Sequence, residues 1–303
     1  MRCRWFFVGV LAAAFSPAAY AEWIPTNKGI GADAEVREFA PTTNLGASTE
    51  IASRVRNDFI AGNASDGSDR NSAIYTKFDL SDVELPSDLH TAFRMSYRNN
   101  NLNGSRIQDT VTPNPEIRTG LAVYGLDSQI TWAENTITYL NAPGITFDGD
   151  VGTRDFNSDL IFLGTVAFPE IGLQNHLPIG GFLELRSADL DQFVSVALAG
   201  GATEVTLVST MIHGGDAPFG NWINFNYLFN PKEKTTLNGD NYAPDGVTDM
   251  GNLFGTDNST GAFSPQLLIV PEPAGVMLLT FALASLAACP GRVRTGRQIA
   301  FPE

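Results

Sequence analysis

A period of two recurs along the chain, with apolar and polar side chains alternating through residues 74–80 and 93–98. Such alternation predicts strands that bury one face. No sustained helical period is found between the two ends of the chain. The pattern therefore predicts an all-β fold, an antiparallel β-sandwich of jelly-roll type. Further candidate strands are residues 121–126, 181–185, 193–198, 205–210, 223–229 and 266–270.

The first residues have the composition of a secretion signal. Arg2 and Arg4 precede an apolar stretch over residues 5–15, and Ala19-Tyr20-Ala21 offers small residues at the two positions that a signal peptidase reads. We expect residues 1–21 to form a signal helix that is cleaved, so that the mature chain begins at Glu22. The protein is then exported.

A second apolar run, residues 274–289, lies near the C-terminus between Pro271-Glu272-Pro273 and the basic residues Arg292 and Arg294. Sixteen helical residues extend about 24 Å, slightly less than the hydrocarbon thickness of a bilayer. The arginines favour a cytoplasmic location for the end that follows the run. The run is therefore predicted to be a transmembrane helix that anchors the chain until it is processed.

Residues 271–303 contain a tripeptide, an apolar run and a basic end in that order. This arrangement resembles the PEP-CTERM sorting signal. In that family, Pro271-Glu272-Pro273 would be the cue for an exosortase, a membrane-embedded protease-transpeptidase. The resemblance implies a protein sorted to the cell surface or the extracellular matrix, with an exosortase-type enzyme as partner. An ordinary C-terminal membrane anchor is the alternative interpretation.

Residues 22–270 form the predicted body, interrupted by insertions rich in Asn, Gly and Pro near 99–115 and in Asn, Asp and Gly near 230–264. Both cysteines, Cys3 and Cys289, lie in the predicted removable ends, which excludes disulfides from the body. Removing the five arginines and two glutamates of the ends from totals of 19 basic and 33 acidic residues leaves 14 and 31, a net charge of about −17. Nucleic acid is thereby excluded as a partner, because it requires a basic footprint.

Several segments of the body resemble DNRLRE-type modules, the disaggregatase-related β-sandwiches. The most specific is the segment from Trp132 and Glu134 to Asn141 and Pro143, which is similar to the family's Trp-x-Glu-x-x-Ile-Thr-x-x-x-Asn-x-Pro signature; the second aromatic that the family often has is missing at Tyr139-Leu140. The resemblance implies a β-sandwich attached to cell-surface or polysaccharide-active proteins, some of which bind polysaccharides. The other similar segments are Asp33–Arg54, Ser72–Ser81 and Ser264–Ile269.

The chemistry of Trp132, Glu134, Asn141 and Pro143 favours a structural role. The indole is expected to pack on the sandwich, and Asn141 and Pro143 are expected to set a turn. Direct contact with a ligand is the alternative.

Trp222, Asn224 and Asn226 share one face of a predicted strand. An indole plate beside two amides is a combination that stacks on a sugar ring and hydrogen-bonds its hydroxyl groups. We hypothesise a glycan surface there, against simple edge packing. The negative charge of the body favours a neutral glycan. An anionic one would need a basic cluster such as Arg94, Arg98 and Arg106, or a bridging Ca²⁺.

Asp240, Asp245 and Asp249 offer the oxygen ligands that Ca²⁺ prefers, although their spacing does not fit an EF-hand. A structural Ca²⁺ there is one hypothesis, and a solvated turn is the other. No other cofactor is indicated.

Catalytic signatures are not found in the sequence. The body has no Gly-x-Ser-x-Gly elbow, and its histidines, His90, His176 and His213, are far apart and form no metal-spaced cluster. We therefore expect a non-catalytic surface or matrix protein with a structural or adhesive role through extracellular polysaccharide. A dedicated carbohydrate-binding module for one glycan is the main alternative, and a polysaccharide-active enzyme is a further one.

Overall fold

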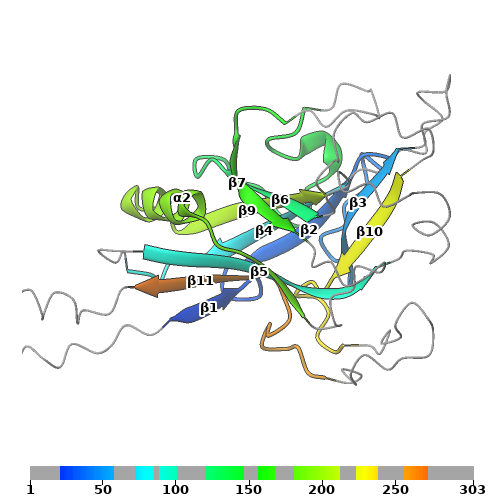
Figure 1. The fold of residues 1–303 in the computed structure, drawn as a ribbon. Helices are drawn as coiled ribbons and strands as arrows, with labels where there is room; N and C mark the ends of the chain where they lie inside the picture. The colour runs from blue at the N-terminus through cyan, green and yellow to red at the C-terminus, as the bar shows by residue number, and fades with distance from the viewer. Residues whose placement is uncertain are drawn as a thin grey trace, which may run out of the picture.

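The structure is a computed structural model, and it consists mostly of β-strands in antiparallel sheets (Figure 1). This confirms the expected β class and the antiparallel pairing. The residues described are 21–57, 72–84, 89–100, 120–146, 156–167, 181–211, 223–237 and 256–271. Within these ranges, only the backbone is described at residues 54–57, 98–100, 120, 167, 211, 223–227 and 271.

The first sheet has the strand order β1-β11-β5-β10-β3, with β8 also paired to β5. Among the described residues, the first strand and the last are neighbours in this sheet, so that Glu22 lies opposite Ile269. Each described pairing is antiparallel. The strands are β1 (Glu22–Pro25), β3 (Ile51–Asn57), β5 (Leu89–Asn100), β8 (Phe182–Leu185), β10 (Ile223–Phe229) and β11 (Gln266–Pro271).

The second sheet has the strand order β2-β4-β9-β6-β7, again with antiparallel pairings. Its edge strand β7 carries a register shift opposite Val123 and Tyr124 of β6. The strands are β2 (Ala32–Arg37), β4 (Ser72–Asp79), β6 (Gly120–Leu126), β7 (Leu160–Ala167) and β9 (Glu204–Met211).

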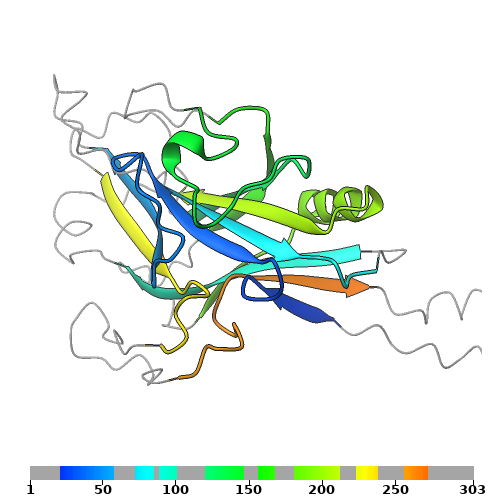
Figure 2. The same cartoon turned by 180° about the vertical axis from the view of Figure 1, so that it is seen from behind.

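The main hydrophobic core lies between the two sheets (Figures 1 and 2). Phe78 of β4 meets Phe93 of β5 edge-on, with ring centroids 6.1 Å apart. Each sheet contributes alternate residues of its strands to this core, as the period of two predicts. Phe78 and Phe93 leave at most 2 % of their surface exposed, which shows that the two inner faces exclude solvent.

A second hydrophobic cluster covers the opposite face of the second sheet. Residues 127–146, which we call the cover segment, contribute Trp132, Ile137 and Tyr139 to it, and these pack with Tyr75 of β4 and Val208 of β9. All eight residues of β4 are buried as a result. The expectation that this strand exposes one face is therefore wrong, because the cover segment takes the place of solvent.

One predicted strand, residues 193–198, is wrong. These residues belong to helix α2 (Ala188–Ala199), whose buried residues Leu190, Val194 and Ala197 recur at helical spacing. Ser187 caps the helix by accepting a hydrogen bond from the backbone N–H of Leu190 at 3.1 Å. The cap satisfies one of the N-terminal donors of the helix, and the acidic residues Asp189 and Asp191 of the first turn suit the positive end of its dipole, both of which favour a helix over a strand here.

Among the described residues, no helix is long and apolar enough to cross a bilayer. Both the expected signal helix and the expected C-terminal span fall outside the described residues. So do most of the two predicted insertions, namely residues 101–115 of the first and 238–255 of the second.

Candidate functional sites: an acidic centre and an aromatic stack

Trp132 lies against the outer face of the second sheet, and its side chain is held on several sides. Its ring meets the Tyr75 ring edge-on, with centroids 5.8 Å apart. Its Nε1 donates to Thr206 Oγ1 at 3.0 Å. The Lys77 ammonium lies 5.1 Å from the ring centroid and donates to the backbone oxygen of Trp132 at 2.8 Å. These contacts attach the cover segment to β4 and β9.

Asn141 and Pro143 shape the end of the cover segment. Asn141 Oδ1 accepts a hydrogen bond from the backbone N–H of Thr138 at 2.6 Å, across the short 3₁₀ turn η2 (Tyr139–Asn141). Pro143 and Gly144 are the central residues of the next turn, and Gly144 has a φ of 85°. Pro followed by a residue of positive φ is the arrangement of a type II turn. Asn141 and Pro143 thus both lie in local turns, as expected from the sequence.

Glu134 connects the cover segment to β2 and to the loop that follows it. Its Oε1 accepts a hydrogen bond from the backbone N–H of Asp33 at 3.0 Å, and its own backbone oxygen accepts one from Asn44 Nδ2 at 2.7 Å. Together with the bond from Lys77 to Trp132, these contacts join three of the segments that resemble DNRLRE modules. Segments that are about 100 residues apart in sequence meet here.

Two further carboxylates converge on that of Glu134. One oxygen each of Asp33, Glu134 and Glu233 lies within 4.8 Å of the other two. The Lys232 ammonium is 2.8 Å from Glu134 Oε2 and 3.9 Å from Glu233 Oε1, and it donates to the backbone oxygen of Gly31 at 3.0 Å. We call Asp33, Glu134, Glu233 and Lys232 the acidic centre. It joins β2, the cover segment and the residues that follow β10.

Two oxygens of the acidic centre, Asp33 Oδ1 and Glu233 Oε2, are buried without a hydrogen-bond partner. The other Asp33 oxygen, Oδ2, accepts from Thr26 Oγ1 at 2.5 Å and from the backbone N–H of Lys232 at 3.0 Å. Burial raises the pKa of Asp33 to about 6, although these hydrogen bonds oppose the rise. Burial, with the nearby charge of Asp33, raises the pKa of Glu233 to about 9. Full ionisation of the centre is therefore unfavourable unless a proton or a cation compensates the negative charge.

The exposure of the three carboxylates determines what they can do. Asp33 has no exposed surface, whereas the side chains of Glu134 and Glu233 are 24 % and 21 % exposed. A bulky substrate cannot reach the buried Asp33 carboxyl group, whereas the two glutamates are partly accessible to solvent. The arrangement suits cation binding or proton sharing.

Sequence reasoning identified Glu134 as part of a motif but missed Asp33 and Glu233. The two residues are 200 positions apart, and no local spacing connects them. One signal was present, because Asp33 is a carboxylate within the short apolar strand Ala32–Arg37. A carboxylate buried in a strand usually has a specific partner.

A second arrangement of interest lies on the outer face of the first sheet. The Arg94 guanidinium carbon is 3.6 Å from the ring centroid of Trp23 on one side and 4.1 Å from that of Phe182 on the other. The Phe182 ring is stacked with that of Phe263, with centroids 6.3 Å apart and planes inclined by 8°. We call Trp23, Arg94, Phe182 and Phe263 the aromatic stack. All four residues are partly exposed.

Polar side chains flank the aromatic stack. Arg94 Nε donates to Gln266 Oε1 at 2.7 Å, and Arg94 lies opposite Glu184 in the pairing of β5 with β8. Glu184 is itself hydrogen-bonded to Arg186 at 2.6 Å. Arg94 is therefore held between two rings and an amide, while the side chain of Arg98, expected to join it in a basic group, is outside the described residues, as is Arg106.

No protein-family model matches the chain, and a search of curated proteins finds no relative. The two family resemblances remain predictions.

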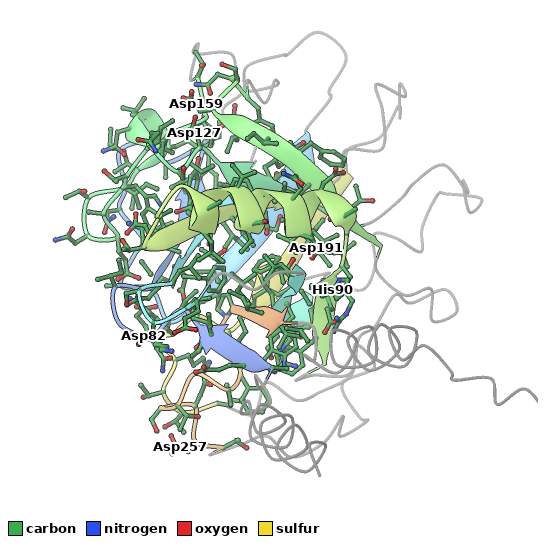
Figure 3. All side chains as sticks on the ribbon, turned by 90° about the vertical axis from the view of Figure 1, so that its left-hand side faces the viewer. Asp82, His90, Asp127, Asp159, Asp191 and Asp257 are labelled. Atoms are coloured by element: carbon green, nitrogen blue, oxygen red, sulfur yellow. The ribbon has the colours of Figure 1, made fainter. Side chains whose placement is uncertain are left out.

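His90 is the one histidine of the body that the structure describes, and it lies beside the start of helix α2 (Figure 3). Its Nδ1 is 3.6 Å from Asp191 Oδ2. Asp191 Oδ1 also accepts from both the backbone N–H and the hydroxyl of Thr91 at 2.6 Å. These bonds dock the helix on β5.

Several predicted site residues fall outside the described residues. Trp222 is one, and for Asn224 and Asn226 only the backbone positions in β10 are described. The predicted Ca²⁺ ligands, Asp240, Asp245 and Asp249, lie outside as well. So do Ala19 of the predicted cleavage site and Glu272, Pro273, Arg292 and Arg294 of the sorting signal, whereas Ala21, Glu22 and the backbone of Pro271 are described.

Proposed function

We propose that this chain is an exported, non-catalytic surface or matrix protein that contacts extracellular polysaccharide through the aromatic stack. The stack is the observation that carries the proposal. Rings on a sheet face with hydrogen-bonding groups beside them suit a sugar, which presents apolar C–H faces and hydroxyl groups. Trp23 and Phe182 offer the rings, and Glu184 and Arg186 offer the polar groups.

A neutral glycan is the favoured ligand. The body has a net charge of about −17 by the count above, which repels polyanions at long range. Arg94 does not offset this at the stack, because its guanidinium is engaged by two rings and by Gln266.

The ends of the first sheet support export and sorting. Strand β1 begins at Glu22, the residue after the predicted signal cleavage, and β11 ends at Pro271, the first residue of the predicted sorting tripeptide. The strands thus fit between the two predicted processing points. Within this proposal, the fold is a jelly-roll β-sandwich related to DNRLRE modules, and the contacts of Trp132 and Glu134 with the other similar segments support that relation.

Affinity electrophoresis of the full chain in gels that contain neutral polysaccharides tests the proposal. We expect at least one polysaccharide to retard the wild type. Trp23→Ala and Phe182→Ala should lose most of that retardation, because stacking of these rings on the sugar supplies the contact area. Phe162→Ala is the matched control, since Phe162 is 51 % exposed but lies on β7 of the other sheet. Trp222→Ala tests the alternative surface predicted from sequence.

Retardation that survives in both Trp23→Ala and Phe182→Ala would contradict the assignment to the stack. A wild type that no neutral polysaccharide retards would contradict polysaccharide contact of the kind proposed. Retardation by a single sugar class would favour the dedicated binding module, whereas retardation by several would favour a general adhesive role.

A further inference from the structure

The oxygens of the acidic centre are spaced as ligands of one ion. Asp33, Glu134 and Glu233 each place one oxygen within 4.8 Å of the other two. Ca²⁺ binds oxygens at 2.3–2.6 Å, so two of its ligands on opposite sides are about 5 Å apart. All three carboxylates therefore lie within reach of one such ion without any change in the backbone.

A second observation is independent of this spacing. Asp33 has no exposed surface, and its Oδ1 has no hydrogen-bond partner. Glu233 Oε2 is likewise buried and without a partner. A buried, unpartnered carboxylate oxygen is costly, and such groups are normally satisfied by a donor or by a metal ion. Two of them in one cluster indicate a missing ligand.

The charges of the centre define that ligand further. When an ion displaces their protons, the three carboxylates carry three negative charges, and Lys232 supplies one positive charge. A divalent cation would neutralise the remaining two. Its preference for oxygen ligands and irregular geometry makes Ca²⁺ a better fit than a transition metal, because the centre contains no nitrogen or sulfur ligand.

We infer that Asp33, Glu134 and Glu233 bind one Ca²⁺ ion, with Lys232 as a fixed counter-charge. The ion would join β2, the cover segment and the residues after β10, three parts that are far apart in the chain. This site differs from the one hypothesised at Asp240, Asp245 and Asp249. It is also independent of polysaccharide contact at the aromatic stack.

The test is Ca²⁺ titration of the chelator-treated full chain, followed by thermal unfolding and by calorimetry. We expect saturable binding, and a rise in Tm of about 5–10 °C when Ca²⁺ is in hundredfold excess over its Kd. Glu233→Gln keeps the size of the side chain but removes a ligand charge. We expect it to lower the Ca²⁺ affinity of this site by about tenfold or more, so that one ion fewer is bound at the Ca²⁺ concentration that just saturates the wild type.

Two matched variants control the experiment. Glu204→Gln changes a glutamate that is also paired with a lysine and 22 % exposed, but it lies outside the acidic centre, so its Ca²⁺ response should equal that of the wild type. Asp245→Asn removes a ligand of the other hypothesised site, and the ion that depends on Glu233 should remain.

Lys232→Gln separates the inference from its main rival, in which the lysine ammonium is itself the resident cation. The inference is overturned if the wild type does not bind Ca²⁺. If Lys232→Gln then binds it, the lysine ammonium is the resident cation. The inference is also overturned if Glu233→Gln binds as many ions as the wild type with the same affinity.

Discussion

Two tryptophans of this protein each pack against a basic side chain, on the outer faces of different sheets. Trp132 lies under Lys77 at 5.1 Å, is 8 % exposed and has its Nε1 bonded to Thr206. Trp23 faces Arg94 at 3.6 Å and is partly exposed. An indole ring paired with a cationic side chain is thus a buried anchor in one place and an accessible surface in the other. Burial, more than residue type, distinguishes their roles.

The largest effect is expected from Trp132→Ala. The change leaves a cavity under the cover segment and deprives Thr206 and Lys77 of contacts. Substitutions of buried aromatic residues by Ala cost about 3–5 kcal/mol, so we expect a loss of this size in the free energy of unfolding. Urea denaturation followed by circular dichroism measures it. Thr136→Ala, at an exposed position of the same segment, should cost little.

A smaller effect is expected from Trp23→Ala, which makes the same chemical change at the aromatic stack. An exposed cation–π contact contributes about 0.5–1 kcal/mol, and we expect a loss of about 1 kcal/mol. The same urea measurement gives a direct comparison. Equal losses for the two tryptophan variants would contradict the distinction between anchor and surface.

The smallest effect concerns Asp79, at the end of the buried strand β4. Hydrogen bonds from Ser81, with a further one from the backbone N–H of Ile30, hold the pKa of Asp79 below its ordinary value of 3.8. A lowered pKa means that the ionised form stabilises the fold above pH 3.8 and that this contribution is lost as the pH falls through the folded-state value. Asp79→Asn should therefore cost about 1 kcal/mol at pH 7 and less at pH 3.

The measurement for Asp79→Asn is the difference in unfolding free energy from the wild type at each pH, which cancels the titration of other groups. A difference that stays constant from pH 7 to pH 3 would show that the ionised carboxylate does not supply the stability.

The sequence allowed much of the first sheet to be predicted. The period of two located the strands that are now β5, β8, β10 and β11, because one face of each packs on the core and the pattern reports that face. It failed at 193–198, where alternation and helical spacing coexist and the Ser187 cap decided the outcome. It also failed for the burial of β4, which depends on a segment more than 50 residues away.

The acidic centre was less predictable than the fold. Glu134 stood in a recognisable motif, but its importance depends on Asp33 and Glu233, which only the folded chain brings to it. The aromatic stack has the same property, since Trp23, Arg94, Phe182 and Phe263 come from four separate segments. Sites assembled from distant segments leave no local pattern, because their spacing is set by strand pairing and not by distance along the chain.

The pairing of β1 with β11 also constrains the order of folding. Glu22 cannot find its partner Ile269 until nearly the whole body has been synthesised, and closing a loop of that length is slow because of its entropy. Until then, the edge of β5 that pairs with β11 and the strand β1 itself can pair with wrong partners. The first segment to emerge is therefore among the last to be secured, so a chain that loses residues 266–271 should aggregate rather than form a smaller stable body.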